Sequence, residues 1–399
     1  MLPMFDELAK SQKDIATQLS YQIQSKTFTQ VNLFGGSRYS LRMTAAIETA
    51  RALSCREGGE QLCRCSSCRK FETLTMQNLI IVSHRDHTSV IETALSSFLR
   101  LKNDFSRLFL LRSVRILLLQ YHASLLGDTQ SAAQSTNYDS ASGVSDLLME
   151  LAQEDGDITD KRAKSLVQGL RSALKPLLVA SRKNTTISIN QVRSLEEWVN
   201  RTSMGDQKIF IIIEGLEQTG ASARNSLLKL LEEPPKDVYF FLISEYPNRI
   251  MQTILSRVRK YSFPPLKEGE VNSLLTPFFL GGEHFENLES FFLQGGGLDL
   301  ARHAEIVEVL LTSIANHSYL KEEQFNELLS FIDAQGSYEY VLKRLLSCLG
   351  DLLARGELSW QRAKALSSLI SSSYSSATLY NQNKRLMFEA LYLKLMEVA

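Results

Sequence analysis

Four of the five cysteines lie within fourteen residues of one another, as Cys55, Cys63, Cys65 and Cys68. Thiolate sulfur is a preferred ligand of zinc, and four cysteines in one loop can close a tetrahedral site that fixes the loop. In a reducing compartment such a cluster indicates a metal rather than disulfide bonds. We therefore predict a structural zinc site on these residues. Only one residue separates Cys63 from Cys65, which leaves open whether all four bind.

A second segment that could do chemistry is Gly36–Thr44, which follows an apolar strand pattern and precedes a helical one. A nucleotide-binding P-loop needs glycines that let backbone N–H groups surround phosphates, a lysine for the outer phosphates and a hydroxyl for magnesium. Here Tyr39 and Leu41 stand at the glycine positions, and Arg42 and Met43 stand at the lysine and hydroxyl positions. Magnesium takes oxygen ligands, which methionine lacks. Taken alone, the segment predicts an ordinary strand–turn–helix connection that binds no ATP.

The apolar strand predicted at 208–213 is followed by Glu214, at a place where an ATPase carries a magnesium-binding carboxylate and then a catalytic glutamate. The residue that follows is Gly215, so the catalytic carboxylate is missing. On its own, Glu214 is interpreted as a solvated strand end. Neither half of a working ATP site is therefore complete.

Two further segments predict no chemistry when each is taken alone. Asn225–Pro235 indicates an amphipathic helix that stops at its prolines, because proline disfavours helical geometry in the residue before it. Leu255–Val258 indicates the end of a helix, at which Ser256 and Arg257 stand side by side. An arginine at a helix end is usually solvated or favourably placed on the helix dipole.

The elements that must position these residues alternate between apolar strands and helices up to about residue 264. Strands are predicted at 30–34, 78–82, 208–213, 238–243 and 260–263. The fully apolar ones are typical of a buried parallel sheet. Between the second and third strands, residues 86–184 indicate a helical insertion with a polar surface loop at about 128–146, and its basic residues are interpreted as a solvated face. From residue 266 onward the pattern is helical only.

The overall composition excludes several classes of protein. The 399 residues include 44 Lys and Arg and 44 Asp and Glu, so the formal net charge is zero. A balanced charge argues against a chain that coats DNA on its own by counterion release. The N-terminal residues lack a signal-peptide pattern, and no apolar run is long enough to span a membrane. We therefore expect a soluble cytoplasmic protein.

Together and in this order, the cysteine loop, the Ser226–Pro235 string and the Ser256–Arg257 pair resemble the clamp-loader family of bacterial DNA polymerase III. The resemblance covers about residues 1–84 and 185–310, and the rest only by architecture. It implies a fold of the α/β plus all-α class. The implied parts are a AAA+ parallel-sheet domain of the P-loop type at 1–264, a helical lid at 265–310 and a helical collar for oligomerisation at 311–399.

In that family, the Ser-Arg pair sits at a subunit boundary, and its arginine reaches ATP bound to the neighbouring subunit. The resemblance therefore implies that Arg257, with Ser256, is an arginine finger that acts in trans on the transferring phosphoryl group. Val258 stands where the family commonly has cysteine. Because Gly36–Thr44 and Glu214 form only a degenerate ATP site, the resemblance is to the delta-prime branch, which can act as a stator without ATPase activity of its own.

The resemblance further implies a place in the DNA polymerase III holoenzyme. The implied partners are gamma/tau and delta subunits, with the sliding clamp and primed DNA reached through the complex. Two alternatives stay open. A gamma/tau-like ATPase would use Arg42 in place of lysine, and it differs by binding ATP with magnesium. A zinc-stapled scaffold or DNA adaptor, without a clamp-loading role, differs by leaving a partner ATPase unaffected when Arg257 is replaced.

Overall fold

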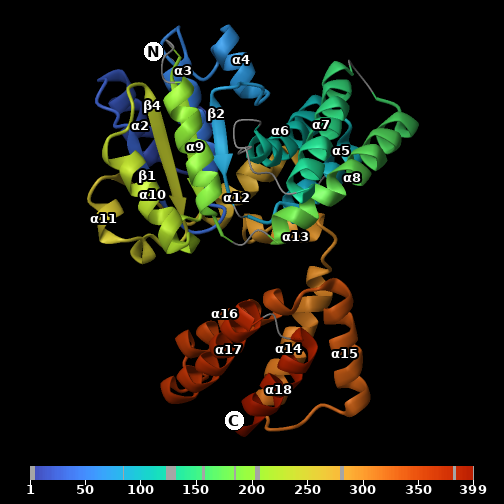
Figure 1. Ribbon diagram of the computed structural model, residues 1–399. Coiled ribbons are helices and arrows are strands. Elements are labelled where there is room, and N and C mark those ends of the chain that lie inside the picture. The colour runs from blue at the N-terminus through green and yellow to red at the C-terminus, as the bar shows by residue number, and fades with distance from the viewer. Residues whose placement is uncertain are drawn as a thin grey trace. The chain divides into compact units, whose positions relative to one another are not determined.

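The computed structural model describes residues 5–83, 85–122, 132–154, 158–183, 186–202, 207–278, 283–380 and 383–398. Its contacts divide the chain into unit 1, Met1–Gly296, and unit 2, Gly297–Ala399. Unit 1 contains a five-stranded sheet with helices around it (Figure 1), and the described part of unit 2 is helical.

The sheet of unit 1 is parallel throughout, in the order β2-β3-β4-β1-β5. Both of its faces are buried: Phe210 and Ile212 of β3 belong to one core cluster, whereas Ile211 between them belongs to the other. This burial explains the continuous apolar runs in the sequence. Because all strands point the same way, the segments that follow β1, β3 and β4 meet at one edge of the sheet. The strands are β1 (Val31–Gly36), β2 (Leu79–Val82), β3 (Ile209–Glu214), β4 (Val238–Ser244) and β5 (Arg259–Phe263).

Helices cover both faces of the sheet (Figure 1). The helices α2 (Lys13–Gln24) and α3 (Arg42–Ser54) pack on one face, and α9 (Ile189–Thr202) and α10 (Ala221–Glu232) pack on the other. Helix α3 begins after the turn that follows β1 and ends at the cysteine loop, so one helix connects two candidate sites. Shorter helices fill the connections: α1 (Asp6–Ala9), α4 (Ser66–Glu72), η1 (Leu119–Tyr121), η3 (Leu216–Gln218), η4 (Pro247–Arg249) and α11 (Gln252–Leu255).

The segment between β2 and β3 is helical, as predicted, and has a core of its own. The surface loop predicted at about 128–146 is wrong from residue 132 onward, because α7 runs through it; residues 128–131 lie outside the described part. Ala141, Val144 and Leu148 recur at helical spacing and are buried. Burial of this apolar face stabilises a helix although the residues between them are small and polar. The helices are α5 (Thr88–Leu101), α6 (Asp104–Leu118), α7 (Ala132–Gln153) and α8 (Asp160–Lys183).

Three short helices follow the sheet and complete unit 1. They form a small apolar cluster with residues of the turn after β1 and of the helices between β2 and β3. The ring of Phe278 is central to this cluster, with its centroid 4.8 Å from that of Phe105 and 4.9 Å from that of Phe109. The three helices are α12 (Glu268–Leu275), η5 (Thr276–Phe278) and α13 (Leu288–Gly295).

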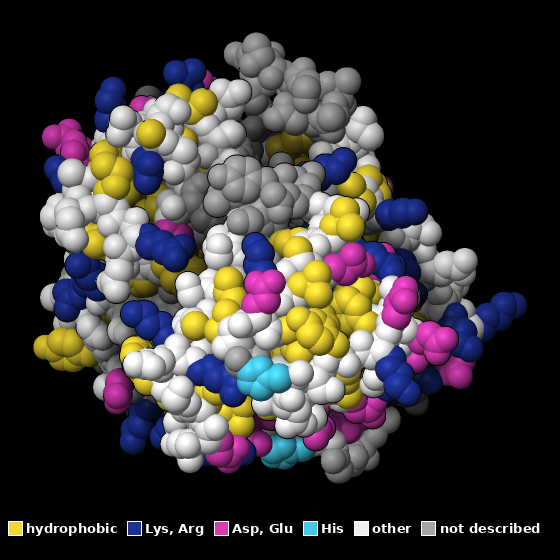
Figure 2. Space-filling model, turned by 90° about the horizontal axis from the view of Figure 1, so that it is seen from below, with side chains coloured by type: hydrophobic (Ala, Val, Ile, Leu, Met, Phe, Trp, Pro, Cys, Tyr) yellow, Lys and Arg dark blue, Asp and Glu magenta, His cyan; other side chains and the backbone are white. Residues whose placement is uncertain are grey.

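Unit 2 is built in its described part from helices that share one core. Large hydrophobic side chains also stay exposed on this unit, at Tyr319, Trp360, Leu386 and Leu393. Figure 2 shows hydrophobic side chains gathered among charged ones on the face of unit 2 that is turned towards the viewer. Across the described ranges of the whole chain, no helix is long and apolar enough to cross a membrane. The helices are α14 (Leu300–Ala315), α15 (Glu322–Gln335), α16 (Tyr338–Ala354), α17 (Trp360–Tyr380) and α18 (Lys384–Glu397).

The architecture confirms the predicted α/β plus all-α fold class, because a parallel-sheet domain is followed by helical parts. The boundary between the two units, after Gly296, falls inside the predicted lid at 265–310. The reason is that α12 and α13 pack on unit 1, whereas α14 packs in the core of unit 2. The finer division into AAA+ domain, lid and collar stays a prediction.

Candidate functional site

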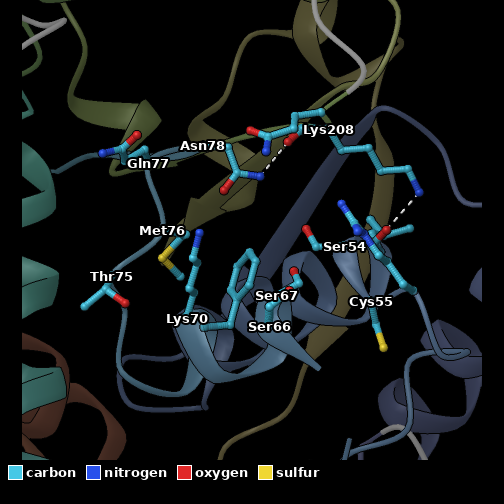
Figure 3. A pocket seen from close by; sticks show the side chains of 14 residues that line it. Ser54, Cys55, Ser66, Ser67, Lys70, Thr75, Met76, Gln77, Asn78 and Lys208 are labelled. Carbon is cyan, nitrogen blue, oxygen red and sulfur yellow. Dashed lines mark hydrogen bonds between the residues drawn. The ribbon is translucent and has the colours of Figure 1, made fainter. Parts of the chain in front are cut away.

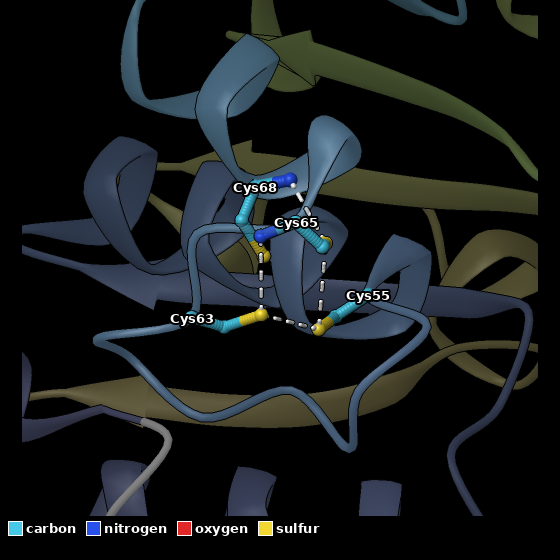
Figure 4. Close-up of side chains that lie close together, drawn as sticks. All are labelled: Cys55, Cys63, Cys65 and Cys68. Atoms are coloured by element: carbon cyan, nitrogen blue, oxygen red, sulfur yellow. Dashed lines mark hydrogen bonds between the residues drawn. The ribbon is translucent and has the colours of Figure 1, made fainter.

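The four clustered cysteines converge at the C-terminal end of α3 (Figure 4). All four Sγ atoms lie within 4.8 Å of one another. The Sγ atom of Cys55 is 3.5 Å from that of Cys63 and 4.0 Å from that of Cys65, and Cys68 reaches the cluster from α4. A zinc ion bound at about 2.3 Å to four sulfurs in a tetrahedron spaces them by roughly 3.8 Å. The cluster could therefore hold a metal ion of this kind.

Backbone hydrogen bonds position the sulfur atoms of the cluster. Three N–H groups of the loop donate to them, at 3.4 Å in one case and 3.5 Å in two. Burial raises the pKa of the Cys65 thiol, but the N–H groups of Cys68 and Arg56 outweigh it and lower that pKa to about 6. Burial raises the pKa of Cys68. Metal binding requires deprotonated thiols, so a bound cation would be needed to hold Cys68 as a thiolate.

A buried arginine of α3 ties the cysteine loop to the helix. The guanidinium of Arg51 donates to the carbonyls of Gly59 and Glu60, at 3.2 and 3.0 Å. It also pairs with Glu48 at 2.8 Å and lies 3.5 Å from the Sγ atom of Cys68. Its positive charge favours negative charge on the cluster. This role could not be predicted from the sequence, because an arginine on a helix is usually solvated.

The turn after β1 keeps a left-handed backbone at the positions where a P-loop has glycine. Tyr39 has φ 61° and Leu41 has φ 67°, a conformation that costs a residue with a side chain about 1–2 kcal/mol. Gly36 also has positive φ, and a Cβ there would clash with the carbonyl oxygen of Phe263, so β5 passes close to the turn. The backbone shape is therefore retained, while side chains stand at positions 39 and 41.

These side chains are used in the fold. The ring of Tyr39 lies 5.2 Å from that of Phe292 in α13, and Leu41 packs against the same apolar cluster. Arg42 is only 5% exposed. Its Nη2 atom lies 3.8 Å from Oε1 of Glu245, and burial lowers its pKa. The arginine that replaces the P-loop lysine is thus enclosed rather than extended towards solvent.

The two residues after Arg42 supply at most one oxygen for magnesium. Met43 is half-buried against the sheet core and has no oxygen in its side chain. Thr44 has a hydroxyl but is exposed in the first turn of α3. Magnesium needs a near-octahedral set of oxygen ligands, so this end of α3 is poorly suited to hold it.

Glu214 is not the solvated strand end that the sequence indicated. Its side chain is 13% exposed and its Oε1 lies 3.5 Å from Nη1 of Arg85. Its Oε2 accepts a hydrogen bond from Ser83 at 2.8 Å. Burial raises the pKa of Glu214, but Arg85 and Ser83 outweigh it, so the pKa lies below its usual value. The pairing of β2 with β3 brings Glu214 to Ser83, which is 131 positions away in the chain, so the local sequence could not show this burial.

Arg257 lies at the surface, two residues after α11 ends, and its side chain is 37% exposed. Its Nη2 atom lies 2.8 Å from Oε1 of Glu232. Its Nη1 atom donates to the carbonyl of Thr253 at 2.6 Å and to the hydroxyl of Ser256 at 3.3 Å. Because Glu232 belongs to the Ser226–Pro235 string, this ion pair brings the string into contact with the Ser256–Arg257 pair. Neither segment alone predicted any chemistry.

Comparison with known proteins places the chain in a family. A family model described as DNA polymerase III, delta subunit, matches residues 11–129 and 120–267. The chain belongs to this family. The matched region holds the cysteine loop, the Gly36–Thr44 turn and Arg257.

Parts of this chain are similar to proteins named as delta' subunits. The DNA polymerase III subunit delta' of Bacillus subtilis is 40% identical over 85 residues, which is 21% of this chain and 26% of the relative. The delta' subunit of Pseudomonas aeruginosa is 39% identical over 79 residues, 20% and 24% of the two chains. The chain thus spans about a quarter of the length of these relatives. A solved DNA polymerase III gamma subunit-related protein of Thermotoga maritima aligns with 95% of this chain and 99% of its own, at 12% identity and a TM-score of 0.42.

In this member of the delta-subunit family, sequence reasoning missed Ser83, Arg85 and His87, which follow β2 at alternate positions. The side chain of Gln120 donates to Nε2 of His87 at 2.7 Å. Burial lowers the pKa of His87 to about 3, so its ring is neutral at neutral pH. The available signal was three polar residues directly after an apolar strand, at the edge where parallel strands place their sites.

Proposed function

We propose that this chain is a delta-prime-type subunit of the DNA polymerase III clamp loader and helps to place the sliding clamp on primed DNA during replication. It hydrolyses no ATP itself and serves as a stator, while Arg257 acts on ATP held by a neighbouring subunit. The observation that carries the proposal is that Arg257 is exposed, whereas the residues at the positions of an ATP site contact other parts of the fold. These residues are Tyr39, Leu41, Arg42 and Glu214. The partners are the gamma/tau and delta subunits.

An ATPase of the same family is the weaker alternative, because several groups would have to move at once. Tyr39 and Leu41 would have to leave the apolar cluster around Phe278. Arg42 would have to leave its buried position beside Glu245. Even then, no hydroxyl stands at the magnesium position. We therefore expect that the isolated chain does not bind ATP with magnesium.

A stator needs a lid that stays in place, and contacts between α5 and the lid support this part of the proposal. Thr93 Oγ1 donates to the carbonyl of Phe292 at 2.9 Å. Arg100 pairs with Glu283 at 2.6 Å. A Cβ on Gly295 would clash with Thr93, so α5 and α13 are in close contact. The helices between β2 and β3 would thus act as a brace that holds the lid on the sheet domain.

Arg257 must exchange its partners before it reaches a neighbouring subunit. Its side chain is 37% exposed and that of Glu232 is 45% exposed. Exposed ion pairs of this kind contribute about 0–1 kcal/mol. The charge that develops on a transferring phosphoryl group is a much stronger partner for a guanidinium. The pair with Glu232 therefore holds Arg257 near its place at little energetic cost.

We further propose that zinc is the ion held by Cys55, Cys63, Cys65 and Cys68. Four sulfur donors within 4.8 Å of one another suit a soft metal with tetrahedral coordination. Such an ion would supply the positive charge that keeps the thiols deprotonated and would fix the loop between α3 and α4. A site closed by four thiolates has no free coordination position, so its role would be structural.

The collar is proposed to lie at 311–399 and to join the subunits of the loader, with the AAA+ domain at 1–264 and the lid at 265–310. Trp360 and Leu386 are exposed on unit 2. Interfaces are enriched in aromatic side chains such as that of Trp360. Assembly through this part of the chain would remove them from water.

The experiment that tests the function uses a loader reconstituted with cognate gamma/tau and delta subunits, in the presence of clamp and primed DNA. Only the ATPase subunit beside this chain keeps its P-loop lysine, so hydrolysis reports one site. With Arg257→Ala we expect the rate at that site to fall at least about tenfold, because an arginine finger stabilises the transferring phosphoryl group. Arg249→Ala removes another exposed arginine nearby and should leave the rate unchanged.

Assembly is measured in parallel by gel filtration. Arg257→Ala should assemble as the wild type does, so that a lost rate reports chemistry rather than association. A rate that Arg257→Ala leaves unchanged would remove the arginine finger and favour a zinc-stapled scaffold. A chain that does not assemble with cognate subunits would contradict the proposed function as a whole.

A further inference from the structure

A polar pocket of about 480 Å³ lies beside the cysteine loop in unit 1 (Figure 3). Four segments line it: the end of α3 with the residues after it, α4, the turn before β2 and the residues directly before β3. Since the sheet is parallel, β2 and β3 begin at the edge opposite to the degenerate P-loop. The volume falls in the range of small-molecule sites, about 300–1,000 Å³.

The charges around this pocket are all positive. Arg56, Lys70 and Lys208 line it, and no Asp or Glu is among its lining residues. Lys208 Nζ donates to the carbonyl of Leu53 at 2.8 Å. Within the ranges that the structure describes, neither Arg56 nor Lys70 is in an ion pair. The pocket thus carries positive charge that the described part of the chain does not neutralise.

Hydroxyl groups complete the polar lining, at Ser54, Ser66, Ser67 and Thr75. Figure 3 shows the side chains of Ser54 and Lys70 turned towards the same space from α3 and α4. The Ser54 hydroxyl is shielded from solvent and has no hydrogen-bond partner among the described residues. A shielded hydroxyl without a partner costs free energy, and rotation of the Ser54 side chain towards the pocket would bring it to an acceptor oxygen of a bound anion.

The donor set fits a phosphate ester better than a carboxylate. Three cations exceed the single charge of a carboxylate, whereas a phosphate monoester carries about −1.5 to −2 charges at neutral pH and has three acceptor oxygens. Inorganic phosphate alone would leave much of the 480 Å³ unfilled. Phe71 and Met76 supply an apolar part of the lining, and Asn78 supplies an amide. An organic group of nucleoside size could contact Asn78 and the small exposed parts of Phe71 and Met76.

We propose that this pocket binds a phosphate monoester of nucleotide size. The proposal rests on neither the P-loop nor the clamp-loader role, and it needs no magnesium because lysine and arginine supply the positive charge. Cys55 lines the pocket, but its sulfur turns away towards the other cysteines (Figures 3 and 4). A ligand and a metal ion would therefore not compete. A free nucleoside monophosphate and the 5′-phosphate end of a nucleic-acid strand share this chemistry.

The test measures binding to the full chain without magnesium. Calorimetry follows AMP, and fluorescence anisotropy follows a labelled oligothymidylate with or without a 5′-phosphate. Lys70→Ala should weaken binding by about tenfold or more, because it removes a charge-assisted hydrogen bond, and Lys70→Glu should abolish it. Arg69→Ala changes a neighbouring exposed residue of α4 outside the pocket and should bind as the wild type does. Thermal unfolding checks that each variant is folded.

The arms of the experiment also separate the two sources. If the oligonucleotide binds only with its 5′-phosphate, the site is assigned to a nucleic-acid end. If AMP binds and the oligonucleotide does not, the site is assigned to a free nucleotide. The proposal is overturned if neither ligand binds, or if both oligonucleotides bind equally while AMP does not bind. It is also overturned if Lys70→Glu leaves the affinity unchanged, since the ligand would then sit elsewhere.

Discussion

The two ends of α3 lead to regions with opposite properties. At the N-terminal end, Tyr39 and Leu41 pack in the apolar cluster around Phe278, and Arg42 is enclosed beside Glu245. At the C-terminal end, four thiols converge and accept hydrogen bonds mainly from the loop's own backbone. A site stays able to bind when its donor atoms converge without being used by the fold. It is lost when the same positions hold side chains that pack.

The N-terminal end also shows that backbone shape can persist without its chemistry. Tyr39 and Leu41 keep φ values of 61° and 67°. This conformation costs about 1–2 kcal/mol for each residue, and their packing in the apolar cluster around Phe278 offsets that cost. The difference between the two ends of α3 therefore lies in side chains, and substitutions at either end can test it.

The largest effect is expected from removing a metal ligand. Cys65→Ser should lower the metal content from one ion per chain towards none. It should lower the free energy of unfolding by about 3 kcal/mol or more, because binding of a structural zinc ion contributes directly to folding. Metal analysis and chemical denaturation measure the two quantities. Cys348→Ser, in unit 2, is the control and should keep its metal. A wild type without bound metal, or a Cys65→Ser variant with a full equivalent, would contradict this prediction.

A pair of glycines compares the packing at the two ends of α3. Gly36 and Gly58 both have positive φ, but a Cβ would clash with the Phe263 carbonyl at Gly36 and would meet nothing within 4 Å at Gly58. Gly36→Ala should therefore cost about 3 kcal/mol or more, since β5 must move. Gly58→Ala should cost about 1 kcal/mol, from backbone strain alone. Equal costs in chemical denaturation would show that the P-loop end is not tightly packed.

A smaller, pH-dependent effect is expected at Glu214. Glu214→Gln should lower the free energy of unfolding by about 1–2 kcal/mol at neutral pH. The reason is that it removes the negative charge of the carboxylate, which Arg85 and Ser83 stabilise. The pKa of Glu214 lies below its usual value of 4.5. Its contribution is therefore present above pH 4.5 and is lost as the pH falls through the lower folded-state pKa. Urea denaturation from about pH 6 to about pH 3 should show the difference shrinking. A difference that grows in acid would refute this account of Glu214.

The smallest effect is expected from freeing Arg257 of its partner. Glu232→Gln should change the free energy of unfolding by less than about 1 kcal/mol, because the pair is exposed. Hydrolysis by the reconstituted loader should not fall, since Arg257 itself remains. A fall as large as that from Arg257→Ala would mean that Glu232 has a role beyond holding the arginine.

The sheet could be predicted from the sequence to within two residues at each strand end. Buried parallel strands are continuous apolar runs, such as Ile209–Glu214, and this signal is local. The convergence of the cysteines was also predictable, because the four positions are close in the chain. Helix α7 was missed over 132–146 because small polar residues there resemble a loop, while its apolar residues recur only every third or fourth position.

The rest depends on contacts between distant positions. Glu214 was expected to be solvated because Ser83, its partner, is 131 positions away. The pocket beside the cysteine loop is lined by four separate segments, none of which predicts a site alone. The pairing of Arg257 with Glu232 joins two motifs whose local sequences indicate ordinary helices.

The central claim is that this chain retains the shape of a nucleotide site without its function. The most direct test is calorimetric titration of the purified chain with ATP and magnesium. The chain carries Lys70→Glu, so that the pocket beside the cysteine loop cannot bind the nucleotide. We predict no saturable binding. Saturable binding that Arg42→Ala abolishes would contradict the claim and would make the chain an ATPase-type subunit of its family.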